Sequence, residues 1–125
     1  MDFAERACDL VSLYEKGDWG MFHELGHNMQ RYWWTWDGSV EVTVNLFTLY
    51  TMKHFLGKLG SESHEGLENS QSQEKIDRYV AGGRNIAVWN EDPFLALAMY
   101  YQLIGEFGWD ALKEVFKRYE NDSSL

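Results

Sequence analysis

Cysteine, proline and long hydrophobic runs are scarce in this sequence of 125 residues, and each scarcity excludes a class of structure. Cys8 is the only cysteine, so the chain has no intrachain disulfide, and we expect Cys8 to be a small residue of the core rather than a ligand or nucleophile. No apolar stretch approaches the about 18 residues that suggest a membrane-spanning helix. The acidic start, residues 1–6, lacks the apolar region of a signal peptide.

Basic residues are also few: 11 Lys and Arg stand against 20 Asp and Glu, which gives a net charge of −9. An acidic chain is repelled by a nucleic-acid backbone, so we expect no nucleic acid as a partner. The acidic surface is better explained as a means of keeping the protein soluble. The composition is 45% hydrophobic and 16% aromatic, with one proline and no low-complexity tract, which is typical of a folded globular chain.

The run His23-Glu24-Leu25-Gly26-His27 is an HExxH motif. Residues four apart lie on one face of an α-helix, so the imidazoles of His23 and His27 can bind one Zn²⁺ at roughly 2.0–2.1 Å. Glu24 follows the first histidine and can act on the metal-activated water without binding the metal itself. The motif therefore predicts Zn²⁺ as the cofactor and Glu24 as the catalytic residue. Gly26 inside the motif costs roughly 1 kcal/mol relative to Ala, which predicts that a neighbouring element packs closely there.

A catalytic zinc ion needs a third protein ligand and an open fourth position. The next acidic residues after His27 are Asp37 and Glu41. Asp37 and Gly38 are typical of a turn, and Ser39 is a possible N-cap, which puts Glu41 in the first turn of the following helix. We therefore favour Glu41 as the third ligand, with Asp37 as the competing candidate.

Residues 20–50 resemble the M60-like, or enhancin-type, zinc metallopeptidases. The resemblance rests on the HExxH motif with its flanking Phe22 and Asn28, on the aromatic residues after it, and on the run Glu41-Val42-Thr43-Val44-Asn45. The later stretches 94–97, 107–109 and 116–119 are also similar to that family. The resemblance implies that His23, His27 and Glu41 bind zinc and that Glu24 is the general base.

The resemblance also implies what such a protein would do. It implies peptide-bond hydrolysis in protein or glycoprotein substrates of the mucin type, and a full-length protein that is secreted or lies at the cell surface. Some animal relatives in the family are channel-associated proteins. A zinc-stabilised, non-catalytic binding or regulatory module is therefore the alternative, although the complete set of histidines and glutamates favours catalysis.

Helical periodicity predicts a mainly α fold for residues 1–125, which we interpret as a single domain. Zincin-type peptidases usually carry a β-rich subdomain before the HExxH helix, and the sequence before His23 is too short to supply one. We therefore expect a fragment: an orthogonal helical bundle forming the metal-bearing, C-terminal helical half of a zincin-like (thermolysin-like) catalytic domain. The predicted helices cover residues 3–16, 19–32, 39–59, 73–81, 93–106 and 108–120, with a loop at 60–73. A strand is the alternative for 39–50, because β-branched residues cluster there.

Several other residues have two possible roles. Asn45, one turn beyond Glu41, either orients that ligand or serves in capping and packing; Asp37 and Asn28 are weaker candidates for the same orienting role. The three tryptophans Trp33, Trp34 and Trp36 form either a sugar-stacking platform or part of the core, and we favour core packing for at least two of them.

Two further points concern the other histidines and the oxyanion donor. His54 and His64 are predicted not to bind the metal. A donor that steadies the oxyanion could be Tyr79, Arg84 or His64, and the sequence does not choose among them.

Overall fold

The computed structural model describes residues 2–122, which are mainly helical and contain no strand. The mainly α fold is confirmed, and the strand alternative for residues 39–50 is excluded because residues 40–50 lie in a helix and Ser39 precedes its first turn. The α-helices are α1 (Phe3–Cys8), α2 (Leu10–Glu15), α3 (Trp19–His27), α4 (Val40–Leu56), α5 (Asn69–Ala81), α6 (Ile86–Glu91), α7 (Pro93–Phe107) and α8 (Trp109–Asn121). Two short 3₁₀ helices, η1 (Gly60–Glu62) and η2 (Glu65–Leu67), lie between α4 and α5.

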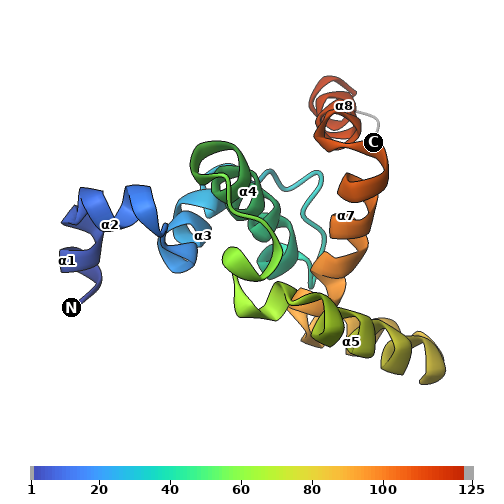
Figure 1. Cartoon of the computed structure of the whole chain (residues 1–125). Helices are drawn as coiled ribbons and strands as arrows, with labels where there is room; N and C mark the ends of the chain where they lie inside the picture. The colour runs from blue at the N-terminus through green and yellow to red at the C-terminus, as the bar shows by residue number, and fades with distance from the viewer. Residues whose placement is uncertain (1, 123–125) are drawn as a thin grey trace.

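Helix α4 lies at the centre of the molecule, with α3 packed on one side and α7 on the other (Figure 1). Helices α1 and α2 project from one end, α5 extends outward past the lower end of α7, and α8 crosses its upper end. The two ends of the described chain therefore lie on opposite sides of the molecule. Among residues 2–122, no helix has both the length and the hydropathy needed to cross a bilayer.

The core lies mainly between α4 and α7. Its buried side chains are Val42, Leu46, Leu49, Leu67, Trp89, Ala96, Leu97, Tyr100 and Ile104. The β-branched residues at the start of α4 have modest helix propensity, but Val42 and Val44 are fully buried. Burial of such side chains stabilises the fold by roughly 1.5–3 kcal/mol each, which outweighs a propensity cost below 1 kcal/mol.

Helix α7 begins where its sequence predicts. The Asp92 side chain accepts hydrogen bonds from the backbone N–H groups of Phe94 and Leu95, both at 3.0 Å, and Pro93 occupies the first turn. A proline there loses no helical hydrogen bond, because the first N–H groups of a helix have no intrahelical acceptor.

The predicted helix over residues 3–16 is wrong in one respect, because it is broken at Asp9. The Asp9 side chain accepts a hydrogen bond from the Ser12 N–H at 3.0 Å and so begins a second helix. Helical spacing puts Leu10 and Tyr14 on one apolar face, but that face is exposed: Leu10 and Tyr14 keep 72% and 68% of their surface accessible. Cys8 is exposed too, so the prediction that it belongs to the core is wrong. It lies on α1, which packs mainly against α2 rather than against the core helices.

Other element boundaries also differ from the predictions, including the end of α4, which lies at Leu56 rather than at residue 59. The motif helix ends at His27 rather than at residue 32, α5 begins at Asn69 rather than at residue 73, and α6 was not predicted. Helix α5 begins early because the Glu68 side chain accepts a hydrogen bond from the Gln71 N–H, which caps it. The predicted loop at 60–73 therefore contains η1, η2 and the first residues of α5.

Candidate metal centre

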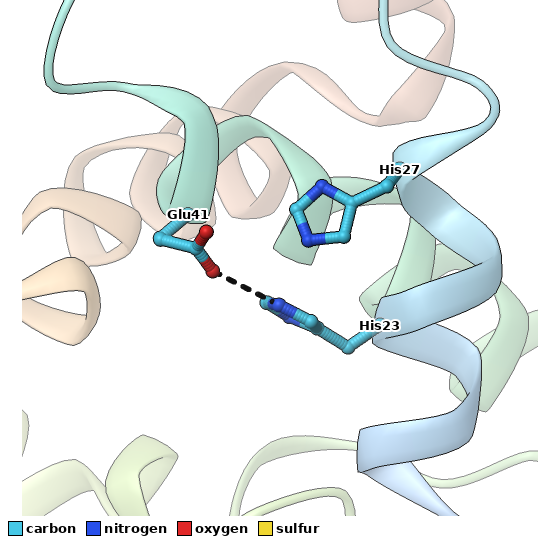
Figure 2. Close-up of side chains that lie close together, drawn as sticks. All are labelled: His23, His27 and Glu41. Carbon is cyan, nitrogen blue, oxygen red and sulfur yellow. Dashed lines mark hydrogen bonds and ion pairs between the residues drawn. The ribbon is translucent and has the colours of Figure 1, made fainter.

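The two motif histidines and Glu41 come together between α3 and α4. His23 and His27 lie one turn apart on α3, and Glu41 lies in the first turn of α4; Figure 2 shows the three side chains pointing toward one another. One ligand atom from each residue lies within 4.8 Å of those of the other two. The closest pair is His23 Nε2 and Glu41 Oε2, 3.0 Å apart.

An amide side chain orients the ring of His23. Asn45 Oδ1 lies 2.8 Å from His23 Nδ1, and the Asn45 Nδ2 group donates to the Glu41 backbone carbonyl at 2.8 Å. Since the amide nitrogen faces a carbonyl, its oxygen faces the histidine, and an oxygen acceptor requires the proton on Nδ1. Nε2 of His23 is then the nitrogen left to face Glu41. The Asn45 side chain therefore orients His23 and not the Glu41 carboxylate, for which the orienting role was predicted.

A second amide orients His27 in the same way. Gln30 Oε1 lies 2.8 Å from His27 Nδ1, while Gln30 Nε2 donates to the Val40 carbonyl at 2.7 Å and to Thr43 Oγ1 at 2.6 Å. Gln30 was not among the predicted site residues. Its position three residues after His27 was the available signal, but the contact depends on the path of the loop after α3.

The donor set fits a zinc ion. With Nδ1 protonated, a neutral His23 presents a lone pair to the Glu41 carboxylate, and two electron-rich atoms at that distance repel unless a proton or cation lies between them. Two imidazole nitrogens and one carboxylate oxygen are a known zinc set, and such ligands lie about 3.4 Å apart around a tetrahedral ion.

The site is covered on one side and open on the other. The His23 side chain is 18% exposed, whereas the Glu41 side chain is 57% exposed. Glu24 is exposed on α3, between the two histidines in sequence. The cluster is therefore open to solvent on the Glu41 side.

The competing candidates lie elsewhere. Asp37 is not part of the cluster found among residues 2–122. The Asn28 side chain donates to the Leu25 carbonyl at 3.2 Å, next to the end of α3. His54 lies against Tyr50, with ring centroids 4.2 Å apart.

His64 packs against aromatic rings outside the cluster. It stacks on Phe94 at 4.5 Å, and its Nδ1 accepts a hydrogen bond from the Gly66 N–H. Burial lowers the pKa of His64, and the nearby Glu65 carboxylate opposes that effect. Tyr79 packs against the core, and Arg84 lies in the turn between α5 and α6 with φ 58°. The oxyanion donor stays unassigned.

The three tryptophans Trp33, Trp34 and Trp36 differ in how deeply they are buried. Trp34 is buried and stacks on Phe116 at 4.8 Å, and Trp33 is partly buried with its edge toward Trp34. Trp36 lies over Trp89 but keeps 47% of its surface exposed. Core packing explains Trp34 fully and Trp33 in part, whereas sugar binding by Trp36 stays a prediction.

The sequence is similar to known proteins along its whole length. Residues 1–125 match the family model described as Peptidase M60, enhancin and enhancin-like. A TRPM8 channel-associated factor homolog from Xenopus laevis is 35% identical over 126 residues, covering 100% of this chain and 14% of that protein. A homolog of the same name from Danio rerio is 37% identical over 109 residues, covering 86% of this chain and 12% of its own length.

TRPM8 channel-associated factor 2 from Homo sapiens is 33% identical over 116 residues, which covers 92% of this chain and 12% of that protein. The chain thus spans 12% to 14% of the length of these curated relatives. No solved structure matches it.

Proposed function

The chain belongs to the Peptidase M60, enhancin and enhancin-like family, and from that premise we propose that it carries the metal centre of a zinc-dependent peptidase. His23, His27 and Glu41 would hold the ion. The observation that carries the proposal is the convergence of their ligand atoms within 4.8 Å, from two helices that the core packs together. The zincin-like architecture of the complete catalytic domain is part of the same proposal.

The residues of this chain would divide the reaction among them. When bound, zinc polarises a peptide carbonyl and makes a water molecule more acidic. Glu24 accepts a proton from the attacking water and passes it to the leaving amine nitrogen. Asn45 and Gln30 hold the Nδ1 sides of the two histidines, which keeps Nε2 of each free for the ion.

We propose a protein or glycoprotein as the substrate. Two observations support this proposal: the Glu41 side of the cluster is open to solvent, and the exposed part of Trp36 is suited to stacking on a sugar ring. A mucin-like substrate would require the full-length protein to act outside the cell or at its surface.

The test is metal content and turnover in the full-length protein. We expect zinc to be lost in His23→Ala and kept in Glu24→Gln, as measured by plasma mass spectrometry. Hydrolysis of a mucin-type glycoprotein should fall by roughly 10²- to 10⁴-fold in Glu24→Gln, because general acid–base catalysis contributes about that factor. Undiminished cleavage by Glu24→Gln would overturn the mechanism, and equal zinc content in His23→Ala would overturn the ligand set.

A second function is favoured by the names of the relatives, which describe association with a channel protein. In that case the chain would be a zinc-stabilised module that binds another protein without catalysis. Removal of zinc by a chelator would then lower the melting temperature and abolish partner binding, while wild-type protein and Glu24→Gln would be equally inactive on every peptide substrate. Turnover that depends on Glu24 would exclude this alternative.

A further inference from the structure

We propose that Gln30 is a positioning residue of the metal centre, which fixes His27 and ties it to the turn of α4 that carries Glu41. The inference rests on the proposed zinc centre and assigns a role to a residue that lies outside the HExxH motif. It comes from three contacts made by a single amide.

The three contacts use both ends of the Gln30 amide. Its oxygen lies 2.8 Å from His27 Nδ1, and its nitrogen donates to the Val40 carbonyl and to Thr43 Oγ1. The Thr43 hydroxyl donates its own proton to the Ser39 carbonyl at 3.1 Å, so its oxygen is available to accept. Turning the amide over would set its oxygen against the Val40 carbonyl oxygen, and the amide therefore has one favourable orientation.

That orientation determines which nitrogen of His27 faces the ion. An amide oxygen only accepts hydrogen bonds, so His27 must carry its proton on Nδ1 and present the Nε2 lone pair. A histidine held in this way binds a metal without first losing rotational freedom or changing tautomer.

The same amide also bridges the two helices at the site. Val40 and Thr43 lie on either side of Glu41 in the first turn of α4, whereas His27 is the last residue of α3. The segment between them, residues 28–39, contains no α-helix or strand. Gln30 therefore bridges a histidine ligand and the backbone beside the carboxylate ligand across an irregular connection.

Each histidine thus has an amide partner of its own, but the two partners differ in what they join. Asn45 lies on α4, one turn from Glu41, and reaches across to His23. Gln30 follows His27 on the α3 side and reaches across to α4. Loss of Gln30 should therefore disturb both the ring of His27 and its distance from Glu41.

The experiment measures zinc affinity in the full-length protein by competition with a chromophoric chelator, with His23→Ala as the background for other zinc sites. We expect Gln30→Leu to weaken zinc binding by roughly 10- to 100-fold, the usual effect of removing a group that orients a metal ligand. The visible absorption spectrum of the Co²⁺-substituted protein should change as well, because it reports the geometry around the ion. The melting temperature of the metal-free protein should stay within a few degrees of wild type.

Two further variants separate positioning from packing. Gln73→Leu makes the same chemical change at an exposed glutamine on α5, whose side chain bonds Asp77, and should leave zinc affinity unchanged. Thr43→Val removes one acceptor of the Gln30 amide while leaving Gln30 and His27 in place, and should weaken zinc binding less than Gln30→Leu does. If Gln30→Leu also lowers the melting temperature of the metal-free protein, the zinc affinity of Thr43→Val decides whether Gln30 acts by positioning His27 or only by stabilising the fold.

The outcomes distinguish this inference from the proposed function. If wild-type protein binds no zinc beyond the His23→Ala background, the metal centre itself fails and the role of Gln30 fails with it. If wild-type protein binds zinc but Gln30→Leu binds it within about two-fold and keeps the Co²⁺ spectrum, the inference about Gln30 is overturned and the metal centre stands. If Gln30→Leu proves unstable, Thr43→Val is the deciding variant. Unchanged zinc affinity in Thr43→Val would then overturn the inference that Gln30 bridges the two helices.

Discussion

Gly26, between the two motif histidines, sets how closely α3 approaches α4. It is buried, and a Cβ added there would lie 3.0 Å from Val44 Cγ2 and 3.2 Å from the Val44 carbonyl oxygen. Helix propensity would make Gly26→Ala stabilising by about 1 kcal/mol, but overpacking costs roughly 1–3 kcal/mol. We expect a net loss of about 1 kcal/mol in the free energy of unfolding, measured by urea denaturation, together with weaker zinc binding as the helices separate.

The control for that substitution lies on the same helix. A Cβ at Gly20 would meet Asp18 Oδ1 at 3.4 Å, an ordinary contact, so Gly20→Ala should leave stability unchanged or slightly raised. Equal stabilisation by both substitutions would show that close packing is not what requires glycine at position 26. The close approach itself was predictable, because a glycine inside an amphipathic helix is costly unless a neighbour occupies the missing side chain's place.

At the residue scale, the sequence predicts contacts that follow from helix geometry. It does not predict contacts that depend on the path of an irregular segment. His23 and His27 share a face because of their spacing, and Glu41 joins them because a turn precedes it. Gln30 was not predictable in the same way, since its amide reaches Val40 through the path of an irregular segment. That the three cluster residues bind a metal stays a prediction.

At the scale of elements, local capping signals decide which boundaries are predictable. An aspartate followed by a proline is typical of a helix start, and α7 does begin at Pro93, where the helix over 93–106 was predicted to begin. Helix α6 was missed because it is short and its residues are mostly exposed, which leaves little periodic pattern in the sequence. It begins instead with a hydrogen bond from the Ala87 N–H to the Asn85 side chain.

The Asp92 cap should be worth more than an ordinary one, because its carboxylate also accepts a hydrogen bond from Lys75 Nζ at 2.7 Å. We expect Asp92→Ala to lower the free energy of unfolding by about 1–2 kcal/mol. The measurement is urea denaturation near neutral pH. Asp92→Asn, which keeps an acceptor for the two backbone N–H groups, should lose less.

Low pH should weaken the Asp92 cap at the start of α7. Burial raises the pKa of Asp92, but the hydrogen bonds from Lys75 and from the Leu95 and Phe94 N–H groups outweigh it, so the pKa is lowered from its ordinary value of 3.8. A depressed folded-state pKa stabilises the fold above 3.8, and that stabilisation is lost as pH falls through the lower value. Wild type should therefore lose more stability than Asp92→Asn as the pH is lowered; parallel loss in the two proteins would contradict the assignment.

At the scale of the whole molecule, periodicity predicts which side chains share a face but not which surface covers that face. The apolar residues of α1 and α2 follow the expected helical spacing, yet Leu10, Val11 and Tyr14 are exposed within residues 2–122. In α4 and α7 the same kind of pattern coincides with the core, because these helices pack against each other. What the sequence pattern lacks is the identity of the surface that each helix packs against. Hydrophobic burial is not directional, so an apolar face can pack against any apolar surface.

Tyr100, on the buried face of α7, should make the whole fold less stable at alkaline pH. Burial raises its pKa to about 12, and the nearby Tyr119 adds to the effect, whereas the ordinary value is 10.0. A raised folded-state pKa stabilises the fold fully below pH 10, and that contribution is lost as pH rises from 10.0 to about 12.

We expect wild type to lose about 2 kcal/mol relative to Tyr100→Phe across that range, since each unit of pKa difference corresponds to roughly 1.4 kcal/mol. The phenylalanine variant keeps the ring in the core but has no hydroxyl to ionise, so it is the matched reference. Urea unfolding followed by circular dichroism measures both proteins and avoids quenching of tryptophan fluorescence by tyrosinate. Parallel loss of stability in the two proteins would mean that Tyr100 ionises as readily in the folded chain as in the unfolded one.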